Sequence, residues 1–256
     1  MSRPLFSIIT VTFNAAGTIA STLKSVAEQT CRLFEHIIVD GKSTDNTLEL
    51  IDRLKSENAI VVSEPDRGLY DAMNKGMRLA TGEYYIFLNA GDTFHTADTL
   101  ELISETILEN DFPGIVYGQT EIVDNERRHL GDRHLTAPGN LTLSSFKEGM
   151  TVCHQAFIAY YKITGPFNLD YRYSADYEWC IRCLQHSRRN VYIPATLIDY
   201  LYEGLTTSNR KESLKERFKI MCRYYGTLPT LFRHIAFIPR YLKRKKAEKR
   251  FTSPHC

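Results

Sequence analysis

Short apolar runs, the first of them rich in β-branched residues, recur in the first part of the chain and alternate with segments of helical periodicity. The runs cover residues 7–13, 37–39 and 84–88. Such runs are typical of strands covered on both faces of a parallel sheet. Apolar residues then follow at helical spacing after the first run, at Ile19, Leu23, Val26 and Ala27. The pattern predicts an α/β fold with a mostly parallel sheet flanked by helices.

Each of these predicted strands is followed by a polar residue, namely Asn14, Asp40 and Asp92. The carboxyl ends of strands in an open α/β sheet form the crevice in which ligands bind. Asp and Asn are also common in turns and helix caps, so each residue alone is equally compatible with a structural role. Their recurrence at three strand ends, with a turn and a helix predicted over residues 64–76, indicates a nucleotide crevice.

Five segments, in this order, closely resemble the family 2 glycosyltransferases, which are inverting nucleotide-sugar enzymes with a GT-A fold. They are SIITVTFN, IIVDGKSTDNT, EPDRGLYDAMNKG, GEYYIFLNAGD and SADYEWCIR. Together they spread over about the first 185 residues. The resemblance implies a GT-A-like enzyme that moves a hexose-type sugar, with inversion, from a nucleoside-diphosphate sugar to an acceptor hydroxyl.

The resemblance also implies roles for individual residues. Thr12 and Asn14 would lie near the nucleobase, and Asp40 would accept a hydrogen bond from it. Residues implied to lie near the nucleotide and its diphosphate are Asp66, Arg67, Asn74 and Lys75. Asp92 would hold a divalent metal, Mn²⁺ or Mg²⁺, and Asp176 would be the general base.

The chemistry of the transfer explains these residue types. Displacement of a nucleoside diphosphate leaves negative charge on the departing phosphate, which a divalent cation offsets. Carboxylate oxygens such as those of Asp92 are suitable ligands for Mg²⁺ and Mn²⁺. Inversion also needs a base on the opposite face of the sugar, and a carboxylate can take the proton. Asp176 follows Ser174, a predicted N-cap, and the helix dipole alone would also favour an acid there.

The chain departs from the commonest family pattern in two places. Many members have two adjacent aspartates where this chain has Asp40-Gly41, and a doubled aspartate where it has Gly91-Asp92. The upstream Asn89 is neutral and therefore a poorer ligand for a hard cation. We expect Asp92, the diphosphate and water to hold the metal.

Further candidates for contacts with the acceptor or a phosphate follow later in the chain. His154 and Gln155 precede another apolar run, although a histidine there is as readily satisfied by neighbouring backbone. Thr206, Ser208 and Arg210 follow Gly204 in a segment that could close over the site. Most arginines simply solvate a surface, which is the competing interpretation for Arg210.

The cysteines and the N-terminus predict a cytoplasmic setting. Six cysteines are scattered without a disulfide framework, and the chain enters its first strand without a signal peptide. Cys180, Cys183 and His186 have metal-like spacing within a predicted helix. A structural zinc site normally needs four ligands, so we expect these cysteines to be buried as small apolar residues.

Charge is distributed unevenly, although the net charge is only +2. Residues 210–250 contain fourteen Lys or Arg and three Asp or Glu, which gives +11 and leaves 2 − 11 = −9 elsewhere. Aromatic and aliphatic residues are interleaved with these basic residues, a composition typical of an interfacial membrane segment. The expected anionic-lipid contacts are Arg240, Lys243, Arg244, Lys245, Lys246, Lys249 and Arg250. A solvated or protein-packed helix is the alternative, and nucleic acid is not an expected partner.

These observations predict a GT-A glycosyltransferase domain over residues 1–205 and a helical basic extension over residues 206–256. The expected acceptor is a saccharide, carried on a polyprenyl diphosphate in bacterial polysaccharide synthesis, and the expected location is the inner face of the cell membrane. A sugar-nucleotide nucleotidyltransferase is the alternative enzyme, but its glycine-rich, basic phosphate loop is missing after the first strand. A catalytically silent nucleotide-sugar-binding or scaffold protein is the non-enzymatic alternative. A dinucleotide oxidoreductase is disfavoured because no G-x-G-x-x-G motif follows the first strand.

Overall fold

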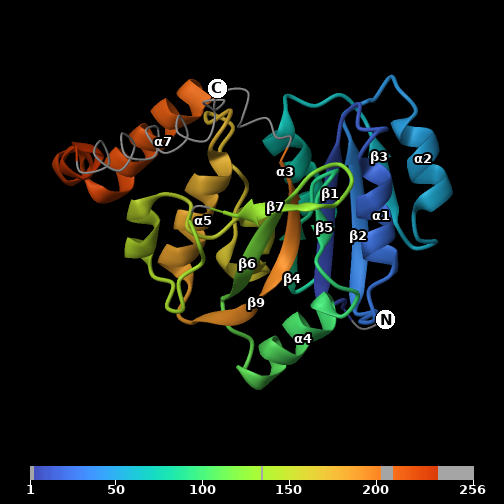
Figure 1. Ribbon diagram of the computed structural model, residues 1–256, viewed down its shortest axis with the longest axis horizontal. Coiled ribbons are helices and arrows are strands. Elements are labelled where there is room, and N and C mark those ends of the chain that lie inside the picture. Colours follow the sequence, from blue (N-terminus) through green and yellow to red (C-terminus); the bar gives the residue numbers. More distant parts are fainter. Residues whose placement is uncertain (1–2, 134, 203–209, 236–256) are drawn as a thin grey trace, which may run out of the picture.

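A nine-stranded sheet forms the centre of the molecule. The computed structural model describes residues 3–133, 135–202 and 210–235. The sheet has the order β3-β2-β1-β4-β8-β6-β9-β5, and β7 pairs with β6 (Figure 1). The strands are β1 (Phe6–Thr12), β2 (Phe34–Asp40), β3 (Ile60–Ser63), β4 (Tyr84–Phe87), β5 (Thr93–Phe94), β6 (Ile115–Val123), β7 (His129–Asp132), β8 (Phe157–Tyr160) and β9 (Asn190–Leu201).

The first four strands in space, β3-β2-β1-β4, are all parallel, as the hydrophobic runs predict. β1 is buried along its whole length, which explains its continuous apolar and β-branched sequence. Thr12 is paired in register with Asp40, so the ends of β1 and β2 lie side by side. Beyond β4 the pairing becomes mixed, because β8 is antiparallel to both β4 and β6 while β9 is parallel to β6. The predicted α/β class is confirmed, and its parallel part is the N-terminal half.

Helices cover both faces of this sheet. The helices are α1 (Ile19–Ala27), α2 (Thr47–Leu54), α3 (Leu69–Leu79), α4 (Thr99–Glu109), α5 (Ala175–His186) and α7 (Arg210–Tyr225), with short 3₁₀ segments η1 (Leu143–Glu148), η2 (His154–Ala156) and η3 (Tyr161–Ile163). Residues of α3, α5 and α7 share one core with inward side chains of β1, β2 and β4. α1 and α4 pack on the other face, and α1 also packs against α2. The result is a three-layer arrangement with the strand ends left open.

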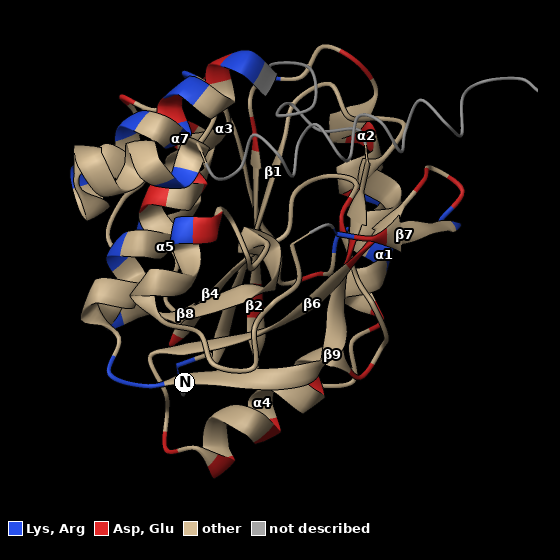
Figure 2. Ribbon diagram, turned by 60° about the vertical axis from the view of Figure 1, so that its left-hand side comes forward, with Lys and Arg blue, Asp and Glu red and all other residues tan. Residues whose placement is uncertain are grey.

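The helix α7 is packed against the rest of the α/β domain. Its Ile220 and Met221 are buried in the same core as the Trp179 side chain of α5. The Glu216 carboxylate accepts hydrogen bonds from the backbone N–H groups of Arg172 (2.9 Å) and Tyr173 (2.8 Å), just before α5. Figure 2 shows that α7 carries a concentration of basic residues, while α4 carries acidic ones. The helical character predicted for this region is therefore present, but residues 210–225 form part of the domain's core.

Ser174 precedes α5 as predicted, but it does not cap that helix through its side chain. Its hydroxyl lies 3.0 Å from the Ser213 hydroxyl of α7 and also faces the Ser213 carbonyl oxygen at 3.3 Å. The prediction that the Ser174 side chain caps α5 is wrong, because the Ser174 hydroxyl interacts with Ser213 of α7 instead. The serine pair ties the start of α5 to α7.

The remaining expectations about this region have clear outcomes. Cys180 and Cys183 are completely buried, as expected for small apolar residues, whereas His186 is exposed. The predicted boundary at residue 205 falls within residues 203–209, which lie outside the described residues and include Thr206 and Ser208. Among the helices that the structure describes, none has the length and apolar composition needed to cross a bilayer.

Candidate active site

The turn after β2 encloses the Asp40 carboxylate. Asp40 is fully buried, and its Oδ2 accepts hydrogen bonds from the Ser43 backbone N–H (2.9 Å) and the Ser63 hydroxyl (2.7 Å). Its Oδ1 accepts another from the Ser43 hydroxyl. In its register neighbour Thr12, Oγ1 is buried and has no hydrogen-bond partner among the described residues. Thr12 therefore offers an unused hydroxyl beside Asp40, and the nucleobase contact inferred for Asp40 stays a prediction.

Asn14 holds the loop that opens the crevice. Its φ of 48° lies in the left-handed region, which asparagine tolerates better than most residues. Asn14 Oδ1 accepts a hydrogen bond from the Thr44 N–H (2.9 Å), and its own N–H donates to the Ser43 hydroxyl (2.8 Å). These bonds connect the end of β1 to the turn after β2, so Asn14 has a clear structural role here.

The turn at residues 64–68 lies against the glycine that replaces the family's second aspartate. A Cβ atom at Gly41 would come within 2.5 Å of Asp66 Oδ2. Asp66 Oδ1 accepts a hydrogen bond from the Gly68 N–H (2.8 Å), which shapes the turn before α3. Gly41 thus permits the close approach of the Asp66 turn. The Arg67 side chain is largely exposed and lies 3.5 Å from Asp71 Oδ1.

Asn74 and Lys75, on α3, each hold a neighbouring segment in place. The buried amide of Asn74 donates to the Phe167 carbonyl oxygen (2.9 Å) and accepts from the Phe167 N–H (2.7 Å). The ammonium of Lys75 donates to the Pro65 carbonyl oxygen (2.6 Å) and pairs with Glu64 at 2.9 Å. The diphosphate role inferred for these two residues stays a prediction, since both have protein partners.

Asp92 is buried at the end of the segment that follows β4. Its Oδ2 accepts a hydrogen bond from Gln155 Nε2 (2.8 Å), and its Oδ1 accepts one from the Leu201 N–H (3.0 Å). Burial raises the pKa of the Asp92 carboxyl to about 7, against the lowering effects of these two hydrogen bonds and of the Arg127 charge. Gln155, which was expected near the acceptor or a phosphate, therefore positions Asp92 in this structure.

Asn89 and Gly91, which precede Asp92 in the chain, show how a cation could be accommodated. Asn89 Oδ1 is buried without a hydrogen-bond partner among the described residues, and amide oxygens are ligands for hard cations. Gly91 has a φ of 105°, and a Cβ there would lie 2.7 Å from Leu201 Cδ2. The backbone thus excludes a second carboxylate at position 91. Asp92 and Asn89 are the oxygen ligands that this segment offers.

Arg127 supplies a fixed positive charge close to this segment. It lies in the turn between β6 and β7, and its guanidinium donates to the Gly91 carbonyl oxygen (2.8 Å) and to the Ser21 hydroxyl. A longer bond joins it to the Thr93 hydroxyl at 3.3 Å. Burial lowers the pKa of Arg127, while Asp199 and Asp92 raise it. No sequence pattern indicates Arg127, because its proximity to Gly91 depends on the β6–β7 hairpin.

Asp176 lies in the first turn of α5 and is partly exposed. Its Oδ1 accepts a hydrogen bond from the Tyr70 hydroxyl of α3 at 3.0 Å, and the Tyr177 N–H donates to the same oxygen at 2.8 Å. His154 Nδ1 lies 3.9 Å from Asp176 Oδ2, and burial lowers the pKa of this histidine. His154 Nε2 is buried without a partner among the described residues. Asp176 thus has one oxygen fixed by Tyr70 and the other close to an unsatisfied imidazole.

Two consecutive residues of η2 connect the two predicted carboxylates. Gln155 contacts Asp92 and His154 contacts Asp176, so motifs from distant parts of the sequence meet around η2. Tyr200 on β9 is close to both carboxylates; burial and these negative charges raise the pKa of its hydroxyl. The site combines one carboxylate at a strand end with a second at a helix N-terminus.

Besides Arg127, the structure adds Tyr70 and Arg217, which the sequence did not single out. Tyr70 lies inside the EPDRGLYDAMNKG segment, so its position within a recognised motif could have suggested it. Arg217 of α7 lies with its guanidinium carbon 5.9 Å from the centre of the Tyr177 ring. Burial and the Asp176 charge raise the pKa of Tyr70, and the Arg217 charge opposes this rise. Arg217 Nε is buried without a partner among the described residues. Arg210 begins the same helix, but its side chain is outside the described residues.

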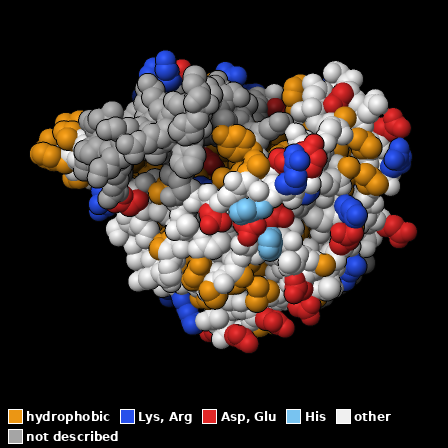
Figure 3. Space-filling view, viewed as in Figure 1, with side chains coloured by type: hydrophobic (Ala, Val, Ile, Leu, Met, Phe, Trp, Pro, Cys, Tyr) orange, Lys and Arg blue, Asp and Glu red, His pale blue; other side chains and the backbone are white. Residues whose placement is uncertain are grey.

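A separate group of possible metal ligands lies on the outer side of the sheet. Ligand atoms of His95, Glu121 and Asp199 lie within 4.8 Å of one another. His95 Nδ1 is 2.7 Å from Asp199 Oδ1, and His129 Nδ1 is 3.0 Å from Glu121 Oε2. Figure 3 shows histidines beside carboxylates near the middle of this face. These residues pair with one another, and none of them is a ligand predicted from the motifs.

Sequence comparison assigns the chain to a family. The sequence profile described as Glycosyl transferase family 2 matches residues 7–163, more than half of the chain. The chain belongs to glycosyl transferase family 2. This membership confirms the resemblance to the family 2 glycosyltransferases. It favours a glycosyltransferase over the alternative of a sugar-nucleotide nucleotidyltransferase. Asp176 lies beyond the matched range, so its role depends on its geometry.

Relatives and solved structures of the family are similar over most of the chain. A PGL/p-HBAD biosynthesis glycosyltransferase of Mycobacterium tuberculosis is 35% identical over 215 residues, 82% of this chain and 78% of that protein. The Escherichia coli UDP-Glc:alpha-D-GlcNAc-diphosphoundecaprenol beta-1,3-glucosyltransferase WfgD is 24% identical over 224 residues, 86% of this chain and 87% of WfgD.

Two solved structures share the fold. TarS 1-349 of S. aureus in complex with UDP-GlcNAc has a TM-score of 0.71 at 19% identity, over 91% of this chain and 73% of that one. The mannosyltransferase PcManGT of Pyrobaculum calidifontis, in complex with GDP-Man and Mn²⁺, has a TM-score of 0.62 at 18% identity. The match covers 99% of this chain and 82% of the PcManGT chain. The GT-A-like fold is therefore confirmed.

Proposed function

We propose that this family 2 glycosyltransferase transfers a sugar, with inversion, from a UDP-sugar to a hydroxyl of a lipid-linked saccharide. The observation that carries the proposal is the meeting of Asp92 and Asp176 around η2, through Gln155 at 2.8 Å and His154 at 3.9 Å. Such a pair separates two tasks, which are stabilising the leaving diphosphate and activating the acceptor.

In this proposal Asp176 takes the proton of the acceptor hydroxyl. Tyr70 donates to Asp176 Oδ1, which orients the carboxylate and leaves Oδ2 toward His154. The unsatisfied His154 Nε2 is available for a hydroxyl or phosphate oxygen of a bound substrate. The inverting outcome follows if the acceptor oxygen lies between Asp176 and the anomeric carbon, opposite the leaving diphosphate.

Asp92 and Asn89 fit a divalent cation, Mn²⁺ or Mg²⁺. Each Asp92 oxygen accepts one protein hydrogen bond and keeps a second lone pair, and Asn89 Oδ1 is unsatisfied. When bound, the cation would offset negative charge on the diphosphate. Arg127 adds a fixed positive charge beside Gly91, which supports the same function with only one carboxylate present.

The choice of a UDP-sugar and a lipid-linked acceptor is supported by the relatives. TarS is solved with UDP-GlcNAc, and the name of WfgD specifies a UDP-glucose donor and a diphosphoundecaprenol-linked acceptor. In this chain, the unused Thr12 hydroxyl lies where the nucleobase is expected.

Contact with an anionic membrane surface, on the cytoplasmic side, is part of the proposal. Four large apolar side chains are exposed on the helical segment 227–235, at the i, i+3, i+4 and i+7 spacing of one helix face: Leu228, Leu231, Phe232 and Ile235. They form the orange region at the left-hand end of Figure 3. The seven basic residues between Arg240 and Arg250 follow in sequence but lie outside the described residues. An apolar face next to a basic stretch is typical of peripheral membrane binding.

A two-stage experiment tests the proposed function. Thermal-shift measurements with UDP- and GDP-sugars, with and without Mn²⁺, identify the donor, because a ligand that binds the native state raises the melting temperature. The chosen donor is then incubated with a synthetic polyprenyl-diphosphate saccharide, and NMR assigns the anomeric configuration of the product. Donor binding without any turnover would instead favour the silent binding protein, and retention of configuration would exclude Asp176 as the base.

A further inference from the structure

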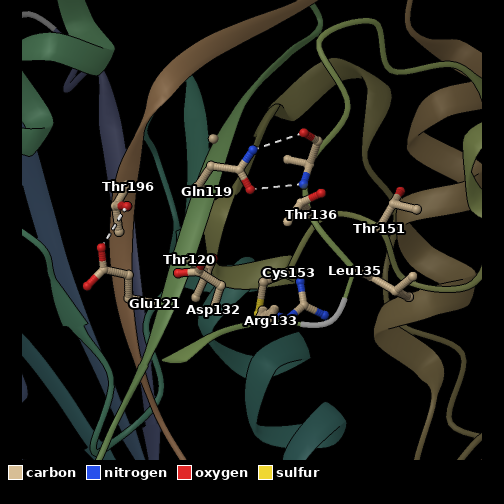
Figure 4. A pocket seen from close by; sticks show the side chains of 12 residues that line it. Gln119, Thr120, Glu121, Asp132, Arg133, Leu135, Thr136, Thr151, Cys153 and Thr196 are labelled. Carbon is tan, nitrogen blue, oxygen red and sulfur yellow. Dashed lines mark hydrogen bonds between the residues drawn. The ribbon is translucent and has the colours of Figure 1, made fainter. Parts of the chain in front are cut away.

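A polar cavity lies beside β6. Its volume is about 140 Å³, and its lining includes residues 118–121 of β6 and residues 132, 133 and 135–137. Figure 4 shows Thr120, Asp132, Arg133 and Cys153 grouped at one end, with Leu135 and Thr151 on the other side. An engineered cavity of roughly 150 Å³ accepts a six-membered ring, so the volume suits one such ring.

Two hydroxyl groups of this cavity have no partner in the structure. Thr120 is 7% exposed and Thr151 is 8% exposed, and the Oγ1 atom of each is buried without a hydrogen bond among the described residues. A buried hydroxyl without a partner costs free energy, so two in one cavity indicate that something else satisfies them. Gln119 contrasts with them, because its amide is fully used by Ala137 and by the Tyr192 hydroxyl.

The remaining lining has the chemistry of a carbohydrate site. Hydroxyls both donate and accept hydrogen bonds, and Asp132 adds an acceptor while Arg133 adds donors. A phosphate has acceptors only and would be matched by several cations, whereas Arg133 is the sole Lys or Arg among the residues that line the described cavity. Leu135 and Ala137 add apolar surface for the C–H face of a ring.

The cavity is connected to the catalytic carboxylate. The Cys153 thiol, in its wall, donates to Gln155 Oε1 (2.8 Å), and Gln155 in turn donates to Asp92 (2.8 Å). Cys153 also directly precedes His154. Burial raises the pKa of Cys153 and lowers that of His154, and the Arg133 charge acts toward a lower pKa at both residues. In the sheet, β6 lies beyond β4 and β8 from the β1–β2 crevice. A nucleotide at Asp40, on β2, would thus be separated from a ring in this cavity by β1, β4 and β8.

We propose that this cavity binds one sugar ring through Thr120, Thr151 and Arg133, and that the ring belongs to the acceptor saccharide. The inference rests on the proposed function for the identity of the ring as acceptor. The donor's own sugar has the same chemistry and is the other possible source. The separation of the cavity from Asp40 by three strands favours the acceptor.

Binding of simple glycosides to the whole protein tests the proposal. Saturation-transfer NMR would be recorded with methyl glycosides of glucose, galactose, mannose, rhamnose and N-acetylglucosamine, in the presence of UDP and Mn²⁺. We expect at least one glycoside to bind, and the double variant Thr120→Val/Thr151→Val to weaken that binding about tenfold, as loss of two hydrogen bonds predicts. The control variant Thr106→Val/Thr164→Val replaces two threonines outside the cavity.

The melting temperature and the donor affinity complete the test. Removal of two unpaired hydroxyls should not lower the melting temperature, so unfolding would not explain a loss of binding. Calorimetry compares UDP with UDP-glucose and UDP-N-acetylglucosamine. If the variant loses the extra affinity of the UDP-sugar over UDP, the cavity holds the donor's ring and the acceptor assignment is overturned. If the protein binds UDP but no glycoside, and the variant leaves the UDP-sugar affinity unchanged, the sugar site is overturned while the proposed function stands. Failure to bind any nucleotide would count against the proposed function itself.

Discussion

The two sides of the crevice differ in how completely their polar groups are satisfied. On the β1–β2 side, Asp40, Asn14 and Asn74 are bonded to their own loops and helices. On the side of β6 and η2, buried atoms of His154, Thr120 and Thr151 have no partner among the described residues. Among the described residues, Thr12 at the end of β1 and Asn89 just after β4 are exceptions on the first side. The difference indicates that motif residues near β1 and β2 largely build the crevice, whereas the opposite side presents unused groups to ligands. Substitutions on the two sides should therefore separate into effects on stability and effects on turnover.

The largest expected effect is at the general base. Asp176→Asn should reduce transfer by ~10²–10⁴-fold at saturating substrate, because the amide cannot take the acceptor proton. Donor affinity, measured by calorimetry, should change little. Asp170→Asn, an exposed loop substitution, is the matched control. A collapse of donor affinity with a preserved rate at saturation would make Asp176 a binding residue.

Asp92→Asn should reduce Mn²⁺-dependent transfer by roughly 10²-fold, since the carboxylate that holds the cation is lost. The measurement is the initial rate as a function of Mn²⁺ concentration, with Asp98→Asn on the surface as control. An unaltered Mn²⁺ dependence at saturating donor would remove Asp92 from the metal site.

The same variant should show a pH-dependent gain in stability without metal. The folded pKa of Asp92 is about 7, above an ordinary carboxyl, so ionisation destabilises the fold progressively from pH 4 to pH 7. Asp92→Asn should therefore match the wild type near pH 4 and exceed it above pH 7, by at most about 4 kcal/mol. Urea unfolding at pH 4.5, 6 and 8 measures this difference. Equal gains at all three pH values would show that the charge is not the cause.

On the β1–β2 side, Asn74→Ala should act mainly on stability. It leaves the N–H and the carbonyl oxygen of Phe167 without their partners, at a cost of about 1–3 kcal/mol in the free energy of unfolding. Turnover per folded molecule should fall less than it does in the Asp176 variant. Asn168→Ala, whose side chain bonds only within its own turn, provides a comparison. If donor affinity is lost at unchanged stability, Asn74 is a nucleotide ligand and the contrast between the two sides fails there.

The smallest expected effect on chemistry is at Tyr70. Tyr70→Phe removes one hydrogen bond to Asp176 and should lower kcat about tenfold with little change in KM, because the carboxylate loses its orientation. The acid limb of the pH–rate profile should also shift, which a purely structural role would not produce. The control is Tyr202→Phe, which changes an exposed tyrosine directly after β9.

Much of this architecture was predictable from residue patterns, and the rest was not for physical reasons. Runs of β-branched residues gave the buried strands β1, β2 and β4, and the five motifs placed Asp40, Asp92 and Asp176 at element ends. Local patterns do not reveal long-range partners, so the bonds from Gln155 to Asp92 and from Arg127 to Gly91 were not anticipated. The packing of α7 was predicted only as the alternative to a membrane segment, because its Ile220 and Met221 are two apolar residues in a strongly basic segment.

The conformation at Gly91 also limits how this enzyme can change over evolutionary time. A single substitution to aspartate would restore the doubled acid of many relatives, but the φ of 105° and the neighbouring Leu201 oppose any side chain there. An enzyme with an aspartate at position 91 would need a smaller residue at position 201 and a different backbone conformation at position 91. These changes would have to occur together. The single-carboxylate arrangement, with Arg127 already bonded to the Gly91 carbonyl oxygen, is therefore easy to keep and difficult to leave by single mutational steps.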